Sequence, residues 1–554
     1  MRQSTKLLLI LLFNMSAYMS AQQLSPTQTL TIDSIFQAWD KTNSPGCALA
    51  VIKDGEIAYS RGYGMADLEH GLAINPRTVF YIGSVSKQFV AMCMLLLAED
   101  GQISLDDDIH KYFPQLPDYG YPISIRNLIH HTSGIRDYLQ LWEMSGRSYL
   151  DKVPEKEALE IICRQKNLNF EPGTRYLYSN SCYFMMALIV RKVTGKNLRE
   201  YAQERIFGPL GMTSTQYYDD NRRLIPNRAF GYGEPVNGTF ANMMMRFDLV
   251  GSGGIYSTVE DLYKWDQNFY HNQIGKQGQA LIDQMLTNGR YKDGTELNYA
   301  FALENGKYKG LRTISHGGAL GGYRSGFLQF PDQRVSVIIL SNLETFDPMG
   351  IAHEVADVVL EKNFLPEVPV YQPKPISLSI EKLKAYTGFY WNDWDGNSRE
   401  IVLRDGVLYY NRGGQSESVL TPVGEGKFIM GADAAAITTV IFFDDHLEVI
   451  QGQEQPTVLT RYEPFIPTEK DLITYAGKYY AADIKDTVEL VALENKLQLV
   501  LADGQKLPLL PAMKDQFYHP YMGSMRFTRK NAKAVEGFTL DAGRVRNVWF
   551  GRGN

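Results

Sequence analysis

The sequence has few cysteines, no excess of positive charge, and no long apolar run beyond its first residues. Four cysteines in 554 residues are too few for a disulfide scaffold, and they lie in apolar stretches. We therefore expect buried free thiols, with disulfide pairing as the alternative, at Cys47, Cys93, Cys163 and Cys182. The net charge of −6 argues against a nucleic-acid binder. No glycine-rich phosphate loop and no Cys/His metal spacing occur, so neither a cofactor nor a metal is predicted.

The one strongly apolar segment lies at the amino end. Arg2 and Lys6 precede an apolar run, and small residues follow it up to Ala21, which is typical of an export signal over residues 1–21. The run is too short to span a bilayer, so no membrane span is expected after cleavage. We predict an exported protein, periplasmic or secreted; an uncleaved amino-terminal anchor is the alternative.

The remaining chain is long enough for several domains. Residues 22–365 have apolar strands at both ends and helical patterns between them. This order predicts an α+β domain whose antiparallel sheet pairs the first strands with the last ones. Four prolines then mark a linker at residues 366–380.

A repeat of short alternating strands follows the linker. The pattern L-x-x-Y-x-G-x-Y begins at Leu383 and again at Leu472, a spacing of 89 residues. Other residues recur at the same offset. We therefore predict two successive small antiparallel β-barrel domains, at residues 381–465 and 466–554.

A hydroxyl group and an amine three residues apart give the first chemical signal. Ser84 and Lys87 lie at the start of a run almost free of glycine and proline, which predicts a helix from Val85 to Asp100. Residues three apart share one helix face, so Lys87 can reach Ser84. A serine hydroxyl is a useful nucleophile only beside a base. Lysine can be that base only if burial or a nearby cation lowers its pKa.

The S-x-x-K pattern at Ser84 and the Y-x-N pattern at Tyr178 are not specific by themselves. S-x-x-K recurs at Ser379, where we expect the cap of a helix after the linker. Y-x-N occurs at Tyr178, and again at Tyr390 and Tyr409, in segments that we expect to be strands or turns. Only Tyr178, with Asn180 two residues later, is expected on a loop directly before a buried helix.

Two further segments have both a functional and a structural interpretation. His130 and His131 are candidates for catalysis, but we favour a role in fixing a loop packed behind the site. The glycine-rich segment 250–254 precedes a helix that Ser257 or Thr258 could cap. We favour a structural turn there over a phosphate site.

These short motifs are unspecific one by one, but their order along one domain makes them informative together. His316-Gly-Gly318 is the one H-x-G in the chain, and such glycines let a ligand or another backbone approach a strand. The three elements are, in order, Ser84-x-x-Lys87, Tyr178-x-Asn180 and His316-x-Gly318. Two further short motifs, His131-Thr-Ser-Gly134 and Ser257-Thr-x-x-Asp261, support the same assignment. With these motifs, residues 30–362 resemble the serine β-lactamase and penicillin-recognising superfamily. The most similar branch contains class C β-lactamases, D,D-peptidases, D-aminopeptidases and related esterases.

The resemblance implies acyl transfer through an acyl-enzyme on Ser84. Lys87 and Tyr178 would share the proton transfers, with the positive charge of Lys87 lowering the pKa of the Tyr178 phenol. Asn180 would orient Lys87 and the substrate amide. The oxyanion would rest on the backbone N–H groups of Ser84 and Ala319, beside Gly318.

The histidine at position 316 departs from the lysine that many class C β-lactamases carry. A lysine is a fixed cation for a β-lactam carboxylate, whereas His316 is charged only part of the time. We therefore expect a peptidase, amidase or esterase rather than an efficient β-lactamase. Arg324 is a candidate for the missing charge, or else a surface ion-pair partner.

The two predicted barrels resemble the layout of D-aminopeptidases, in which such domains shape the entrance to the site and restrict substrates to short ones. Accessory modules with an unknown ligand are the alternative. The leading hypothesis is an exported serine hydrolase for a small-molecule or short-peptide amide, including D-amino-acid substrates. The alternatives are a short-chain carboxylesterase with the same residues and a penicillin-recognising sensor that is acylated without turnover. A structural protein with a dead catalytic domain is disfavoured because Ser84, Lys87 and Tyr178 are all present.

Overall fold

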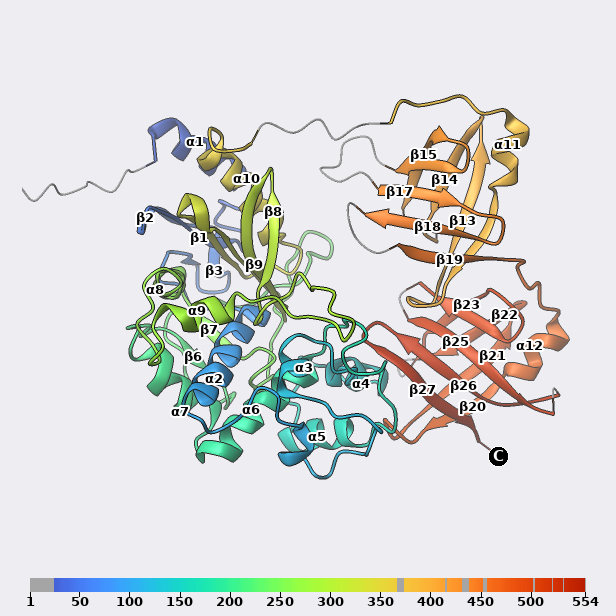
Figure 1. Cartoon of the computed structure of the whole chain (residues 1–554), viewed down its shortest axis with the longest axis horizontal. Helices are drawn as coiled ribbons and strands as arrows, with labels where there is room; N and C mark the ends of the chain where they lie inside the picture. The colour runs from blue at the N-terminus through green and yellow to red at the C-terminus, as the bar shows by residue number, and fades with distance from the viewer. Residues whose placement is uncertain are drawn as a thin grey trace, which may run out of the picture.

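The computed structural model describes residues 24–365, 373–413, 416–430, 438–451, 456–501, 504–520, 522–531 and 533–553. The predicted export signal lies outside these residues, as does the first half of the predicted linker. Figure 1 shows a mixed domain of helices and strands on one side and two β-barrels on the other. The predicted fold class, an α+β domain followed by two antiparallel barrels, is confirmed.

The mixed domain is built on an antiparallel sheet of six strands in the order β2-β1-β11-β10-β9-β8. The strands are β1 (Cys47–Lys53), β2 (Glu56–Tyr63), β8 (Glu304–Tyr308), β9 (Leu311–Leu320), β10 (Tyr323–Phe330) and β11 (Val335–Ser341). β1 pairs with β11 from Cys47 opposite Ser341, so the first strand and the last are neighbours, as predicted. Asp54 and Gly55 both have positive φ in the turn between β1 and β2, which is the usual conformation of a two-residue hairpin turn.

Both faces of this sheet are buried, because alternate side chains of a strand point to opposite sides. On β1, Leu49 and Val51 pack in the core under α1 (Pro26–Ile35) and α10 (Pro348–Leu360). Ala48 and Ala50 belong to the larger core on the other side. This is why β1 is apolar throughout instead of alternating with polar residues.

The larger core is covered by the helical part of the domain. Its helices are α2 (Lys87–Glu99), α3 (Ile125–Ile129), α4 (Tyr138–Met144), α5 (Glu155–Cys163), α6 (Asn180–Thr194), α7 (Leu198–Ala202), α8 (Val259–Asn268) and α9 (Gln279–Met285). Shorter elements are β3 (Met65–Asp67), β4 (Leu72–Ala73), β5 (Phe80–Tyr81), β6 (Gln216–Tyr217), β7 (Ile255–Ser257), η1 (Gly83–Ser86), η2 (Ile109–Lys111), η3 (Gln203–Phe207) and η4 (Pro331–Gln333). α2 is buried from Lys87 to Leu97, which explains its apolar sequence on all sides. Within the described ranges, no helix has both the length and the apolar character needed to cross a bilayer.

Each barrel is closed by eight antiparallel strands after one short helix. The first comprises α11 (Ile380–Ala385), β12 (Gly388–Asn392), β13 (Asn397–Arg404), β14 (Val407–Asn411), β15 (Glu417–Gly424), β16 (Lys427–Met430), β17 (Thr438–Phe442), β18 (His446–Gln451) and β19 (Thr457–Tyr462). The second comprises α12 (Glu469–Tyr475), β20 (Gly477–Ala481), β21 (Asp486–Leu493), β22 (Lys496–Val500), β23 (Lys506–Pro511), β24 (Gln516–His519), β25 (Gly523–Lys530), β26 (Ala534–Ala542) and β27 (Val545–Arg552).

The repeated motif has the same structural role in both barrels. The Tyr390 hydroxyl donates a hydrogen bond to the Tyr386 carbonyl at 3.1 Å, and the Tyr479 hydroxyl donates to the Tyr475 carbonyl at 2.6 Å. The second tyrosine of the motif therefore fastens the first strand to the end of the preceding helix. Ser379 caps α11 by accepting from the Lys382 N–H, so the second S-x-x-K is a helix cap, as predicted.

The four thiols and the barrel contacts complete the architecture. All four cysteines are free, as expected, and three of them are buried; Cys163 is only half-buried, which differs from the expectation. The second barrel lies directly against the mixed domain, with β27 close to α4 in Figure 1. There the buried Arg136 forms an ion pair with Asp483 at 3.0 Å and donates to the Asn547 carbonyl at 2.9 Å. The barrel is therefore anchored next to the segment that carries Asp137.

Candidate active site

Ser84 lies in the 3-10 turn η1, which leads into α2. The predicted helix begins later than expected, at Lys87, because Gly83 adopts a positive φ and a tighter turn precedes the helix. A Cβ atom on Gly83 would lie only 2.5 Å from the Ala319 nitrogen. One on Gly318 would lie 2.2 Å from the Ile82 carbonyl oxygen and 3.0 Å from the Ser84 nitrogen. Glycine at both positions thus lets η1 approach the end of β9, where the two predicted oxyanion donors lie on adjoining elements.

Lys87 lies directly beneath the Ser84 hydroxyl. Its Nζ is 2.9 Å from Ser84 Oγ and 3.0 Å from Asn180 Oδ1, and it also contacts the Ser252 carbonyl oxygen. Burial lowers the pKa of Lys87 well below its ordinary value, and the positive charge of Arg544 lowers it further. The amine can therefore be neutral near neutral pH, which is the form that accepts a proton from a serine hydroxyl.

The Tyr178 phenol does not behave as expected from the sequence. Burial raises its pKa above the ordinary value, even though the charge of Arg544 acts in the opposite direction. The prediction that Lys87 lowers the pKa of Tyr178 is therefore wrong, because desolvation outweighs neighbouring charge and Lys87 itself is driven toward the neutral form. The Tyr178 hydroxyl is buried and faces Ser84 without a hydrogen bond of standard geometry in the described part of the chain. Its proton is available to a substrate atom.

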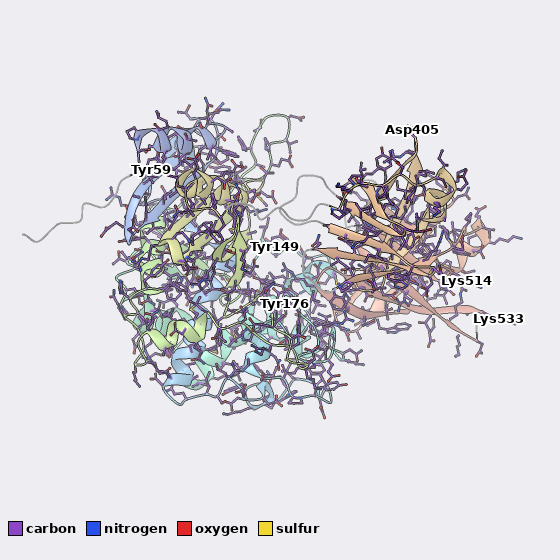
Figure 2. The ribbon with its side chains drawn as sticks, turned by 45° about the horizontal axis from the view of Figure 1, so that its top comes forward. Tyr59, Tyr149, Tyr176, Asp405, Lys514 and Lys533 are labelled. Carbon is purple, nitrogen blue, oxygen red and sulfur yellow. The ribbon has the colours of Figure 1, made fainter. Side chains whose placement is uncertain are left out.

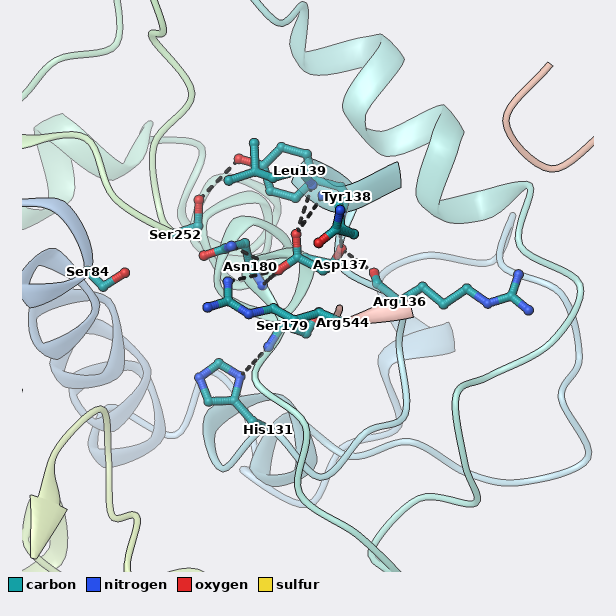
Figure 3. A network of polar contacts seen from close by, with 12 residues as sticks. Ser84, His131, Arg136, Asp137, Tyr138, Leu139, Ser179, Asn180, Ser252 and Arg544 are labelled. Carbon is teal, nitrogen blue, oxygen red and sulfur yellow. Dashed lines mark hydrogen bonds and ion pairs between the residues drawn. The ribbon is translucent and has the colours of Figure 1, made fainter. Parts of the chain in front are cut away.

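Asn180 is held by Asp137, a residue that the sequence interpretation missed. The Asn180 backbone and side-chain nitrogens both donate to Asp137 Oδ2, at 2.7 and 2.8 Å (Figure 3). Asp137 Oδ1 accepts from the backbone N–H groups of Leu139 and Gln140 at the start of α4. An aspartate directly before a helix is an N-cap signal that could have located it. The carboxylate thus joins two helix starts and turns Asn180 Oδ1 toward Lys87.

The two adjacent histidines hold the loop behind the site, in agreement with the favoured interpretation. His131 Nδ1 accepts the Ser179 N–H at 3.1 Å, and its ring lies 4.2 Å from the Tyr178 ring, measured between centroids. Burial lowers its pKa well below the ordinary value, so it is neutral. His130 Nδ1 lies 3.1 Å from the Ala300 carbonyl oxygen, to which it donates.

His316 on β9 is a neutral imidazole. Its Nδ1 lies 2.6 Å from the Gly317 carbonyl, which can only accept, so Nδ1 carries the proton. Its Nε2 then accepts from the Tyr299 hydroxyl at 3.1 Å. Burial lowers the pKa of His316 to about 4, and the charge of Lys87 acts in the same direction. His316 therefore provides no cation near neutral pH.

The glycine-rich segment before α8 contributes through its backbone. Thr258 caps α8 by accepting the Asp261 N–H at 3.1 Å, so the predicted structural turn and cap are present. The Ser252 carbonyl of the same segment accepts from Lys87. The sequence interpretation missed this contact, because a backbone acceptor leaves no signature in residue type.

One cleft of about 630 Å³ brings the predicted site residues together. Its lining includes Ser84, Tyr178, Asn180, His316, Gly318 and Ala319, with Lys87 buried beneath. Strands, a 3-10 turn and the start of α6 each supply part of this set. The three motifs, far apart in the sequence, therefore form one constellation of nucleophile, buried amine and phenol.

The comparisons with known proteins agree with this geometry. The model of the Beta-lactamase family matches residues 32–360, well over half of the chain. The chain belongs to the beta-lactamase family. Its D-aminopeptidase relative from Brucella ovis is 33% identical over 524 residues, covering 92% of this chain and 96% of the relative. A penicillin-binding protein of Bacillus subtilis is 26% identical, covering 78% of this chain and 98% of the relative.

The structural comparison finds a similar fold. The D-amino acid amidase of Ochrobactrum anthropi, solved with L-phenylalanine amide, matches with a TM-score of 0.51 and 25% identity. The match covers 60% of this chain and 98% of the amidase. This beta-lactamase-family chain is accordingly a serine hydrolase.

Two arginines line the cleft of this beta-lactamase-family site. Arg324, on β10, lies 4.0 Å from Glu344 and donates to the Tyr323 carbonyl. It thus lines the cleft and also has an acidic neighbour, so both interpretations of Arg324 apply in part. Arg544 comes from the second barrel. Nothing in the sequence around position 544 marks it as part of a site formed mainly by residues 84–349.

Proposed function

We propose that this enzyme hydrolyses small amides and short peptides, including those with a D-amino acid on the acyl side, through an acyl-enzyme on Ser84. The observation that carries the proposal is the buried Lys87 amine, 2.9 Å from Ser84 Oγ, with a pKa well below its ordinary value. The names of the relatives, D-aminopeptidase and D-amino acid amidase, support the substrate class.

Acylation begins when Ser84 Oγ attacks the substrate carbonyl carbon and gives its proton to neutral Lys87. The carbonyl oxygen becomes an oxyanion that accepts from the backbone N–H groups of Ser84 and Ala319. When the C–N bond breaks, the leaving nitrogen takes a proton from the Tyr178 phenol, which is restored by the proton on Lys87. The amine product leaves, Ser84 is acylated, and Lys87 is neutral again.

Deacylation uses the same groups in the reverse order. A water molecule attacks the ester carbonyl and gives a proton to Lys87, directly or through Tyr178. The ester C–O bond breaks, and Ser84 Oγ recovers its proton as the carboxylic acid is released. Asn180, fixed by two hydrogen bonds to Asp137, holds the amine in place through both steps.

A β-lactam substrate gains no charged contact from His316. The neutral His316 offers no cation to a β-lactam carboxylate, since its pKa is about 4. Short-chain ester hydrolysis is the nearest alternative, because esters need the same nucleophile and base and have a better leaving group. A penicillin-recognising sensor is the second alternative; it would be acylated at Ser84 without release.

Export to the periplasm or the exterior is part of the proposal. It is supported by the charged start, apolar run and small residues within residues 1–21. Determination of the mature amino terminus in the native host tests it. Retention of residues 1–21 on a cytoplasmic protein would contradict it.

The activity test uses four substrates and a matched pair of variants. The substrates are D-alanine p-nitroanilide, its L-isomer, a p-nitrophenyl ester and a chromogenic cephalosporin. Ser84→Ala removes the nucleophile, whereas Ser379→Ala alters the serine of the other S-x-x-K, a helix cap in the first barrel. We expect turnover of the D-anilide that Ser84→Ala abolishes and Ser379→Ala preserves. Turnover of the ester alone would replace the amidase by the esterase, and full activity in Ser84→Ala would refute the site.

A further inference from the structure

A hairpin of the second barrel forms part of the cleft wall. β26 and β27 are joined at Gly543 and Arg544, and Arg544 lines the same cleft as Ser84. A Cβ atom on Gly543, which has a positive φ, would lie 2.5 Å from Gln140 Oε1 on α4. The tip of the hairpin therefore packs closely against α4, beside Asp137 (Figure 3).

The hairpin backbone is fixed on both sides of the tip. Asn169 Nδ2 donates to the Arg544 carbonyl at 3.1 Å, and Asn169 Oδ1 accepts the Arg546 N–H at 2.8 Å. Arg136 donates to the Asn547 carbonyl one residue further on. A side chain that projects from a backbone held in this way has a defined position before any ligand binds.

Of the two arginines in the cleft, Arg544 has the guanidinium that is less committed to protein partners. It lies 4.6 Å from the Tyr178 ring centroid and 3.8 Å from Asp137 Oδ2, and its side chain is 46% exposed. Asp137 already accepts four N–H groups, so it does not need this arginine as a hydrogen-bond donor. Across the described residues, the guanidinium group donates no hydrogen bond within standard geometry.

The position of Arg544 relative to Tyr178 indicates which part of a substrate it would meet. In the proposed reaction the Tyr178 proton goes to the leaving nitrogen. Arg544 lies over the ring of that tyrosine, so a group attached one or two bonds beyond the leaving nitrogen comes within its reach. A guanidinium binds a carboxylate through paired, charge-assisted hydrogen bonds.

We propose that Arg544 binds a carboxylate on the leaving group, which makes short peptides with a free carboxyl terminus the preferred substrates. The inference rests on the proposed function for the peptide case, but the same contact applies to any acyl donor whose leaving group carries a carboxylate. The barrel thereby supplies a specificity-determining residue as well as a wall. Arg324, at 4.0 Å from Glu344, is the competing cation in the cleft.

The test compares two pairs of substrates that differ only in one charge. The peptide pair is D-alanyl-glycine and D-alanyl-glycinamide, and the ester pair is 2-acetoxyacetate and 2-acetoxyacetamide, whose carboxylate or amide lies two bonds beyond the leaving oxygen. The readout is the ratio of kcat/KM for the acid to kcat/KM for the amide within each pair. Wild-type protein is compared with Arg544→Gln, Arg544→Lys and Arg324→Gln. Lys533→Gln removes a positive charge at the far end of the second barrel, away from Tyr149 and Tyr176 (Figure 2), and serves as the control.

We expect the wild-type protein to prefer the acid, and Arg544→Gln to lower the ratio by about tenfold to hundredfold, the range for a charged hydrogen bond. Arg544→Lys should retain part of the preference, and Lys533→Gln all of it. A ratio that is unchanged in Arg544→Gln, or that falls in Arg324→Gln instead, would overturn the inference.

The two substrate pairs separate this inference from the proposed function. An Arg544-dependent ratio on the esters alone would support the inference while the amidase proposal fails. Turnover of D-alanyl-glycinamide without an Arg544-dependent ratio would leave the amidase standing and refute the inference. No turnover of any of the four substrates would contradict both.

Discussion

The pH dependence of catalysis should shift in opposite directions when the two charges nearest Lys87 are removed. Activity requires neutral Lys87, so kcat/KM rises with pH through the pKa of that amine and gives an acidic limb. The charge of Arg544 lowers the pKa of Lys87, and the charge of Asp137 raises it. Arg544→Gln should therefore move the acidic limb to higher pH, and Asp137→Asn should move it to lower pH.

The structure bounds the size of the Arg544 effect. Lys87 Nζ lies 4.8 Å and the Arg544 guanidinium carbon 4.6 Å from the centroid of the Tyr178 ring, so these two atoms are at most about 9.4 Å apart. Two unit charges at that distance interact by about 2 kcal/mol at an effective dielectric constant of about 20. Because the Arg544 side chain is 46% exposed, solvent screens part of this. One pH unit corresponds to about 1.4 kcal/mol, so we expect a shift of about 0.5–1 pH unit.

The assay measures kcat/KM for D-alanine p-nitroanilide, whose leaving group carries no carboxylate, from pH 5 to pH 10 at constant ionic strength. The α-amino group of this substrate titrates at about pH 8, equally for wild type and variants, so only the difference between their limbs is interpreted. Arg544→Lys keeps the charge and is the matched control for Arg544→Gln. Thermal unfolding at each pH excludes loss of folded protein as the cause of a limb. Shifts of the same sign in Arg544→Gln and Asp137→Asn, or no shift in either, would refute the assignment of the acidic limb to Lys87.

Three further predictions concern a close backbone approach in the site, the hairpin of the second barrel and the free thiols. Gly318→Ala places a Cβ atom 2.2 Å from the Ile82 carbonyl oxygen, so η1 and β9 must separate and kcat/KM should fall at least about a hundredfold. The far-ultraviolet circular dichroism spectrum should be unchanged. Near-normal activity would show that η1 can move. Asn169→Ala removes both hydrogen bonds to the β26–β27 hairpin, so we expect the free energy of unfolding to fall by about 1–3 kcal/mol. KM should rise, because the hairpin forms part of the cleft wall. A KM equal to that of the wild-type protein would contradict this role of the hairpin. The denatured protein should present four reactive thiols without reduction, and a smaller number would indicate a disulfide.

The sequence predicts the fold well because its signals are local or periodic. The Asp54–Gly55 turn, the unbroken apolar run of α2 and the tyrosine repeat each determine an element through neighbouring residues. The repeat also indicates two copies of one barrel without any knowledge of long-range contacts. The register of the central sheet does not follow from such signals, because β1 is apolar on both faces and its pattern does not tell one face from the other.

The site is predicted only where residue types are distinctive. Ser84, Lys87, Tyr178 and Asn180 belong to spaced motifs, and the structure places them around one cleft. Arg544 could not be predicted, because its place depends on how the second barrel docks against the mixed domain. The direction of the Tyr178 pKa also depends on burial, which is a property of the folded protein and not of the motif.

The central claim is that Ser84 becomes covalently acylated, and peptide mapping by mass spectrometry tests it most directly. The purified protein is incubated with a fluorophosphonate that reacts with activated serines, then digested and analysed. We predict one adduct, on the peptide that contains Ser84, and none on the peptide that contains Ser379. Labelling should disappear in Lys87→Met, because the amine 2.9 Å from Ser84 Oγ is the proposed base. An adduct on any other residue, or undiminished labelling in Ser84→Ala, would contradict the account.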